Sequence, residues 1–230
     1  KTAVTRNGEW LRLVQGMVYW YGVVSKTNLP QKIRDLTGKA VDRTELTRVI
    51  ESDISFYGVL HESGYGYVLN DAANIEKLVI AQREWFELPH YPFSKVELLE
   101  AGVPGYYERV PELDVFLELL DYYYDITQEK LDEIVQNLNK HMRGSLEPEA
   151  ALKYLESFLE IPAPVVLEAL TAAIAALQKG TRSWVLKGHR PKDVIKEEVP
   201  LVTARVVKRP SAEAFEIHLR KAPVERVKIG

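Results

Sequence analysis

The order of helix and hairpin patterns over residues 10–69 constrains the fold of this chain more than any other feature. In the first part of this stretch, apolar residues recur at spacings of three and four, which predicts a helix with one buried face that ends near Tyr21. Asn28, with Pro30 two places later, is typical of the start of a second helix, and Gly38 is typical of its end. Two helices joined by a short turn are therefore expected to open the fold.

A third helix and a β-hairpin complete this pattern. Asp42 is a suitable N-cap for the third helix, and Glu45 follows at the spacing of a capping box. Between residues 57 and 69, β-forming side chains flank a Glu-Ser-Gly turn that ends at Gly64. Three helices followed by a hairpin have the outline of a winged helix-turn-helix, which we expect over residues 1–88.

Further helix patterns follow this first unit. Residues 89–93 contain two prolines, which interrupt a helix, so this segment is predicted to be a linker. Ser94 and Glu97 then have the spacing of a capping box, which predicts the start of another helix. Several amphipathic helices with short connections follow, so a helical bundle is expected over residues 94–199.

The last residues of the chain, 200–230, are predicted to form a basic tail. Alternating apolar residues at 201–207 and 215–219 predict short strands within it. The expected fold class is therefore mainly α: an N-terminal winged helix-turn-helix, a helical bundle, and a short β-containing C-terminal segment.

Charge is unevenly distributed, although the formal net charge of the chain is only −3. Residues 25–50 hold six Lys or Arg against three Asp or Glu. Residues 179–230 hold thirteen Lys or Arg against six Asp or Glu. Residues 84–136 hold thirteen Asp or Glu against three Lys or Arg. Basic segments can direct a polyanion to one face, but the overall acidity argues against avid nonspecific binding of nucleic acids.

Composition excludes several classes of protein. The longest apolar run, residues 165–177, is shorter than a membrane-spanning helix and is interrupted by Glu168. There is no cysteine, so neither disulfides nor thiolate metal sites can form within these residues. We expect no membrane partner and a cytoplasmic location. The chain starts at Lys1 rather than Met, as a piece of a longer protein would.

No catalytic or metal-binding motif stands out. The sequence has no zinc-protease motif, no nucleophile elbow and no phosphate-binding loop. The five histidines, His61, His90, His141, His189 and His218, are scattered, so we expect no metal site within the chain. An enzyme would have to assemble its site, with or without a divalent metal, from the carboxylates of the acidic helical region.

The third predicted helix offers the first set of candidate binding residues. If it entered a major groove, its outward side chains would contact base edges and nearby lysines would contact phosphates. The candidate residues are Lys26, Lys32, Lys39, Arg43, Thr47 and Arg48. Acidic neighbours, Glu45 and Glu51 among them, work against this prediction, and winged helices also bind proteins. The sequence leaves nucleic acid and protein open as partners.

A second candidate patch lies after the bundle, where bases and an aromatic residue are close in sequence. Its members are Arg182, Trp184, Lys187, His189 and Arg190. Such a tract could stack a base or bind an acidic partner. In the alternative interpretation, Trp184 and Leu186 seal the bundle, and Gly188 and Pro191 shape a turn.

Three passages resemble uncharacterised bacterial proteins, mainly from Firmicutes, that carry a C-terminal SEC-C zinc-binding motif. They are Met17-Val-Tyr-Trp-Tyr-Gly-Val-Val24, Thr181-Arg-Ser-Trp-Val-Leu-Lys-Gly-His-Arg-Pro-Lys-Asp-Val194 and Val227-Lys-Ile-Gly230. The resemblance implies that zinc would be bound only by a cysteine-rich segment following Gly230. Together these features predict a non-enzymatic binding or adaptor module that contacts a nucleic acid or a protein.

Overall fold

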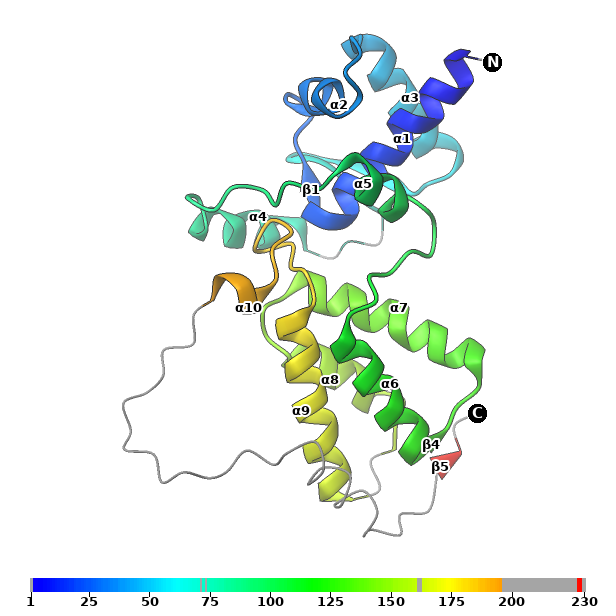
Figure 1. The fold of residues 1–230 in the computed structure, drawn as a ribbon, viewed down its shortest axis with the longest axis vertical. Helices are drawn as coiled ribbons and strands as arrows, with labels where there is room; N and C mark the ends of the chain where they lie inside the picture. Colours follow the sequence, from blue (N-terminus) through cyan, green and yellow to red (C-terminus); the bar gives the residue numbers. More distant parts are fainter. Residues whose placement is uncertain (1, 71, 73, 161–162, 196–226, 229–230) are drawn as a thin grey trace.

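The computed structural model of the protein describes residues 2–70, 72, 74–160, 163–195 and 227–228. Within these residues the chain is mainly helical, with ten helices and a small antiparallel sheet. An N-terminal unit lies at one end of the molecule and a helical bundle at the other (Figure 1). The expectation of a mainly α fold is confirmed.

The N-terminal unit combines five helices with a three-stranded sheet. Its elements are α1 (Thr2–Tyr21), β1 (Val23–Val24), α2 (Leu29–Thr37), α3 (Arg43–Phe56), β2 (Leu60–Ser63), β3 (Gly66–Leu69), α4 (Ile75–Glu84) and α5 (Lys95–Ala101). Strand β3 lies between β1 and β2, and both pairings are antiparallel. The predicted hairpin is present, although its turn lies between Ser63 and Gly66, slightly later than the sequence suggested.

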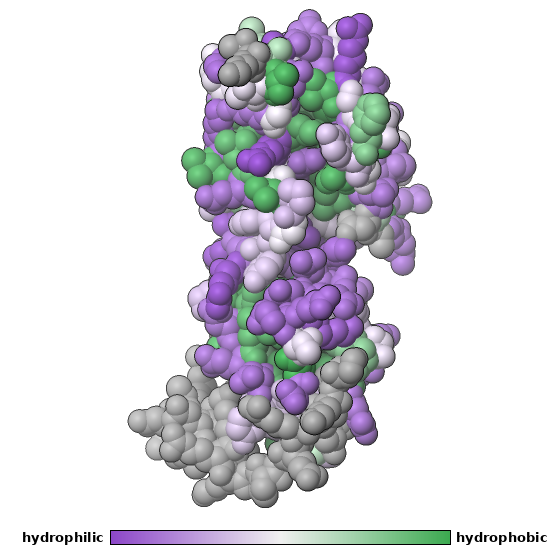
Figure 2. Space-filling model, turned by 90° about the vertical axis from the view of Figure 1, so that its right-hand side faces the viewer, coloured by the Kyte–Doolittle hydropathy of each residue, from purple (hydrophilic) through white to green (hydrophobic). Residues whose placement is uncertain are grey.

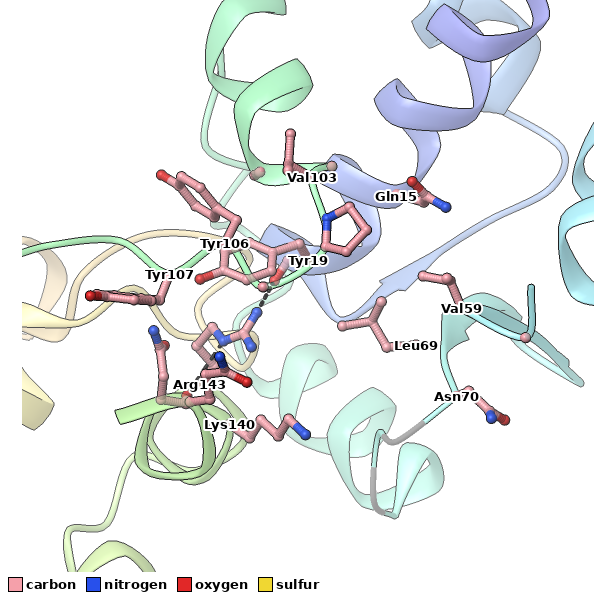
Figure 3. A pocket seen from close by; sticks show the side chains of 17 residues that line it. Gln15, Tyr19, Val59, Leu69, Asn70, Val103, Tyr106, Tyr107, Lys140 and Arg143 are labelled. Carbon is pink, nitrogen blue, oxygen red and sulfur yellow. Dashed lines mark hydrogen bonds between the residues drawn. The ribbon is translucent and has the colours of Figure 1, made fainter. Parts of the chain in front are cut away.

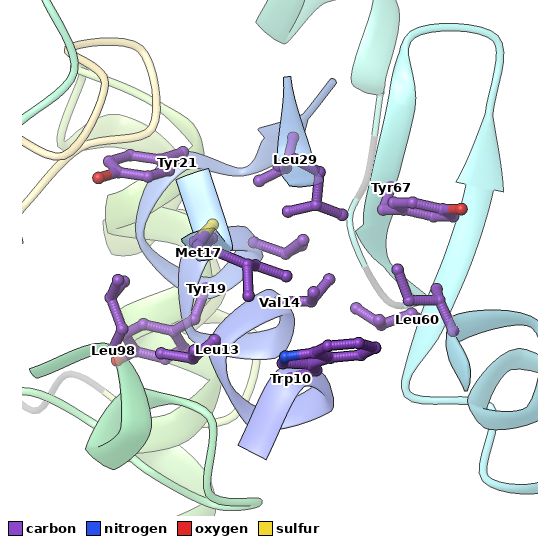
Figure 4. Close-up of a cluster of buried hydrophobic side chains, with 14 of the residues drawn as sticks. Trp10, Leu13, Val14, Met17, Tyr19, Tyr21, Leu29, Leu60, Tyr67 and Leu98 are labelled. Atoms are coloured by element: carbon purple, nitrogen blue, oxygen red, sulfur yellow. The ribbon is translucent and has the colours of Figure 1, made fainter. Parts of the chain in front are cut away.

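Helix α1 is the centre of the N-terminal core. Its side chains pack against α2, α3, the sheet and α5, as Figure 4 shows for Trp10, Leu13, Val14 and Met17. The three-four spacing of the sequence therefore marks the buried face correctly. Since each of these side chains is at most 2% exposed, the helix is held by packing on several sides.

Helix α5 packs in this core, although the sequence pattern placed it with the bundle. A Cβ on Gly16 would lie only 1.9 Å from the Leu98 carbonyl oxygen, so α1 and α5 are in close backbone contact. Phe93, in the segment predicted to be a linker, is buried and stacks on Trp20 with ring centroids 4.7 Å apart. Helix α4 ends at Glu84, before either proline, and the chain leaves this core only between Gly102 and Val110.

The capping box predicted for α5 is present. The Ser94 hydroxyl accepts a hydrogen bond from the Glu97 backbone, and the Glu97 carboxylate accepts one from the Ser94 backbone. These two bonds satisfy donors that would otherwise be left unpaired at the first turn. Hydrogen bonding from the side chain and the backbone of Ser94 to the Glu97 carboxylate lowers the pKa of Glu97.

The bundle forms a second hydrophobic core. Its elements are α6 (Pro111–Tyr123), β4 (Tyr124–Asp125), α7 (Gln128–Gly144), α8 (Glu149–Glu156) and α9 (Pro164–Gly180). The short helix α10 (Pro191–Val194) follows. Strand β5 (Val227–Lys228) pairs in parallel with β4. The strands predicted at 201–207 and 215–219 lie outside the described residues. No helix in the described part of the chain has both the length and the apolar composition to cross a membrane.

Candidate functional site

Helix α3 owes its orientation to its cap and its apolar face. The Asp42 carboxylate accepts a hydrogen bond of 2.7 Å from the Glu45 backbone and so caps the helix. The Glu45 side chain does not complete the box, since it forms an ion pair with Arg6 of α1. Leu46 and Ile50 are buried, at 2% and 1% exposure. The opposite face of α3 is therefore directed outward.

This outward face carries the predicted contact residues at its N-terminal half. Arg43 and Arg48 are exposed, and Lys39 is exposed in the turn before the helix. Thr47 is half-buried, and its hydroxyl donates to the Arg43 carbonyl oxygen at 2.9 Å. Within the described residues, none of these three cations forms an ion pair or a side-chain hydrogen bond. Four of the six predicted residues thus lie along one helix and the turn that precedes it. We call these residues, Lys39, Arg43, Thr47 and Arg48, the α3 face.

Lys26 and Lys32 have different surroundings. Lys26 forms an ion pair with Glu62 of β2, and its Nζ lies 5.3 Å from the centre of the Tyr67 ring. Its charge is thus balanced beside the hairpin. The Lys32 Nζ lies 5.1 Å from the centre of the Tyr21 ring, and burial lowers the pKa of this lysine. Lys32 therefore lies beside Tyr21, close enough to His90 to affect its pKa, and does not join the α3 face.

The hairpin contributes no cation to this surface. The two strands and their turn, residues 60–69, contain no lysine or arginine. Tyr65, in the turn, is 44% exposed, and Glu62 is also exposed. Electrostatic attraction to a phosphate backbone would therefore come from the α3 face and not from the hairpin.

The structure corrects the prediction that Trp184 could stack on a base. Trp184 is only 4% exposed, and its Nε1 donates to the Tyr19 carbonyl oxygen at 2.7 Å. Arg182 is 8% exposed, with its guanidinium 4.0 Å from the centre of the Tyr91 ring and its Nε donating to Glu108. Neither side chain can reach a polyanion without unfolding of its surroundings.

The other members of this second patch are likewise engaged within the protein. The Lys187 Nζ donates to the carbonyl oxygens of Trp85 and Leu88, at 2.6 and 2.9 Å. A ring nitrogen of His189 lies 3.1 Å from the Pro89 carbonyl oxygen, and Arg190 pairs with Glu108 at 2.8 Å. The tract 181–190 is thus the joint between the N-terminal unit and the bundle, and we call it the joint tract. Trp184 is buried, as the alternative interpretation expected, but it packs against Leu78 of the N-terminal unit and not in the bundle core.

One further residue of this joint was not predictable from the sequence. Arg143, in the last turn of α7, is 5% exposed and places its guanidinium 3.8 Å from the centre of the Tyr19 ring. Its Nη1 donates to the Tyr19 carbonyl oxygen at 2.9 Å (Figure 3). A basic residue in the last turn of an amphipathic helix is usually solvated, so the sequence pattern gave no sign of this burial.

Among the described residues, no group of three or more His, Asp or Glu could hold a metal ion. Comparison with known protein families, characterised proteins and solved structures gives no match. The resemblance to SEC-C-containing proteins therefore stays a prediction.

Proposed function

We propose that the N-terminal unit is a winged helix and that the protein is a non-enzymatic module that binds nucleic acid through the α3 face. The order α1-β1-α2-α3-β2-β3, with β3 between the other two strands, supports the winged-helix assignment. In such units the third helix commonly enters the major groove of a duplex. A cytoplasmic location is part of this proposal.

The observation that carries the proposal is the lack of ion pairs at the α3 face. Elsewhere on the N-terminal unit, Arg6, Lys26 and Lys95 each pair with a glutamate. In the described part of the chain, Arg43 and Arg48 have no such partner. Two unbalanced cations on one exposed face give phosphate groups a favourable site.

Acidic residues limit where a duplex could lie. Glu51 is exposed one turn beyond Arg48, where it would repel a phosphate. Contacts are therefore expected at the N-terminal half of α3, with Thr44 and Thr47 nearest the base edges and Lys39 near the backbone. Few phosphates would be contacted, so binding should be weak, with a salt dependence set by that small number of contacts.

The test is a fluorescence-polarisation titration of a labelled mixed-sequence DNA duplex at low ionic strength. Arg43→Glu with Arg48→Glu should weaken binding by at least about 10-fold, since two attractions become repulsions. Lys77→Glu with Lys153→Glu, which makes the same charge change at exposed positions of α4 and α8, should leave affinity nearly unchanged. Equal losses in both double variants would show that only net charge matters and would contradict the proposal.

One observation favours a protein partner as a second candidate function. Phe56 and Tyr57, at the end of α3, are 83% and 76% exposed. Adjacent exposed aromatic residues are common at protein interfaces. If a protein is the partner, Phe56→Ser with Tyr57→Ser should abolish its binding, and the Arg43 and Arg48 variants should bind it normally.

A further inference from the structure

Thr47 lies at the edge of the α3 face, where this helix meets strand β3. It is half-buried, and the neighbouring Arg43 and Arg48 are exposed. Its hydroxyl donates to the Arg43 carbonyl oxygen, four residues earlier, at 2.9 Å. Burial raises the pKa of Tyr67 in β3, and a hydrogen bond with Thr47 is one of the effects that lower it. The Thr47 hydroxyl is therefore engaged within the protein.

This engagement determines what Thr47 can offer a partner. A hydroxyl has one hydrogen to donate, and the Thr47 hydroxyl donates it to the main chain of its own helix. The remaining group of the side chain is its methyl. Because Thr47 is only half-buried, its contact with a duplex would be apolar. Apolar and hydrophilic residues lie side by side on the surface of the N-terminal unit (Figure 2), so contacts there need not be only ionic.

The neighbouring threonine, Thr44, differs in this respect. It is exposed in the first turn of α3. Among the residues that the structure describes, its hydroxyl has no hydrogen-bond partner. Thr44 therefore keeps a donor for a phosphate or a base edge, and Thr47 does not.

The major groove presents one apolar group that distinguishes the bases, the C5 methyl of thymine. Uracil lacks this methyl, and cytosine has a hydrogen in its place. We propose that the α3 face prefers thymine, through contact between the thymine methyl and the methyl of Thr47. This inference rests on the proposed binding of a duplex by the α3 face. It narrows the partner to DNA, because RNA contains uracil and its major groove is too narrow for side chains to read.

The test compares two labelled DNA duplexes that differ only in the thymine methyl groups. One alternates adenine with thymine, and the other alternates adenine with uracil on the same deoxyribose backbone. In fluorescence-polarisation titrations at low ionic strength, the unaltered chain should bind the thymine duplex about fourfold more tightly. This ratio corresponds to the burial of one methyl group.

Two substitutions at Thr47 separate its methyl from its hydroxyl. Thr47→Ser removes only the methyl, so it should bind both duplexes equally, with the affinity that the unaltered chain has for the uracil duplex. Thr47→Val keeps a methyl and should retain the preference. Matched controls are Thr44→Ser and Thr171→Ser, which should behave like the unaltered chain. Thr171, exposed on α9, makes the same bond to its own helix, donating to the Leu167 carbonyl oxygen at 2.7 Å.

The outcomes separate this inference from the function on which it rests. Equal binding of the two duplexes by the unaltered chain would overturn the preference for thymine and leave the proposed duplex binding intact. A preference that persists in Thr47→Ser, or that is lost in Thr44→Ser, would also overturn the assignment to Thr47. If neither duplex binds at low salt, the proposed function itself is contradicted, and the inference fails with it.

Discussion

The α3 face and the joint tract have similar compositions but opposite environments. Both are basic, and both looked like binding patches in the sequence. In α3, a regular apolar face buries Leu46 and Ile50 and so directs the arginines outward. The joint tract has no such period, and its cations are satisfied by carbonyl oxygens, aromatic rings and Glu108. Charge alone therefore does not identify a binding surface. The packing of the charged segment determines whether its cations face solvent or are bound within the protein.

The largest expected effect is on the joint tract, through Trp184→Ala. This change removes a buried indole and its hydrogen bond to Tyr19, and it should lower the free energy of unfolding by about 3–5 kcal/mol. Chemical denaturation measures this loss. Phe56→Ala, at an exposed aromatic residue, should change stability by no more than about 0.5 kcal/mol. A small loss at Trp184 would mean that the tract is not a packed joint.

The same substitution at two arginines compares the segments directly. Arg182→Ala breaks a largely buried pair with Glu108 and removes a stack on Tyr91. It should therefore lower the free energy of unfolding by about 3 kcal/mol. Arg48→Ala, on the exposed α3 face, should lower the free energy of unfolding by no more than about 0.5 kcal/mol. Thermal and urea unfolding of the two variants would report the difference. Equal costs would remove the distinction between the two segments.

Two glycines of α1 test the assignment of α5 to the N-terminal core. Gly16→Ala would place a Cβ against the Leu98 backbone and should destabilise the protein by about 1–3 kcal/mol. Gly8→Ala, in the same helix but with nothing within 4 Å of the added atom, should stabilise it by about 0.5–1 kcal/mol. Stabilisation by both changes would contradict the close contact of α1 with α5.

The smallest expected effect concerns pH and His90. Burial, with Lys32, Lys187 and His189 nearby, lowers the pKa of His90 from 6.5 to about 4. Since the unfolded chain binds this proton near pH 6.5 and the folded protein only near pH 4, stability is lost as pH falls through this interval.

His90→Asn should therefore reduce the drop in melting temperature between neutral pH and about pH 5. Thermal unfolding monitored by circular dichroism at a series of pH values would measure it. His61→Asn, at an exposed position of the hairpin, serves as the control and should follow the unaltered chain. An identical pH profile for His90→Asn would show that the ring is not held in its uncharged form.

Local patterns in the sequence predicted the local structure well. The helix starts at Asp42 and Ser94, and the hairpin before Leu69, follow from side-chain chemistry within a few residues. The boundary between the units could not be found in this way, because Phe93 joins a core built from residues far earlier in the chain. Gly16, an isolated glycine within a helical pattern, was the available sign of a close helix contact.

For the candidate sites too, side-chain orientations set within one helix were predictable, and those set by contacts between distant segments were not. The outward direction of Arg43 and Arg48 was predictable from the helical period of α3. The burial of Arg143 was not, because it contacts Tyr19, more than a hundred residues away in sequence. For Trp184 the sequence left exposure and burial open, and its contact with Tyr19, equally distant in sequence, buries it. The amphipathic period of α7 predicts an exposed basic residue in its last turn, and the docking of Tyr19 and Trp184 buries it.

The salt dependence of duplex binding tests the central claim most directly. For each phosphate contact that is lost, the slope of log affinity against log salt concentration should fall by about 0.9. Arg43→Ala with Arg48→Ala should therefore reduce the magnitude of the slope by about 2, while Lys77→Ala with Lys153→Ala should leave it unchanged. Binding that is absent at low salt, or a slope that is the same in all three proteins, would contradict the proposal that the α3 face binds nucleic acid.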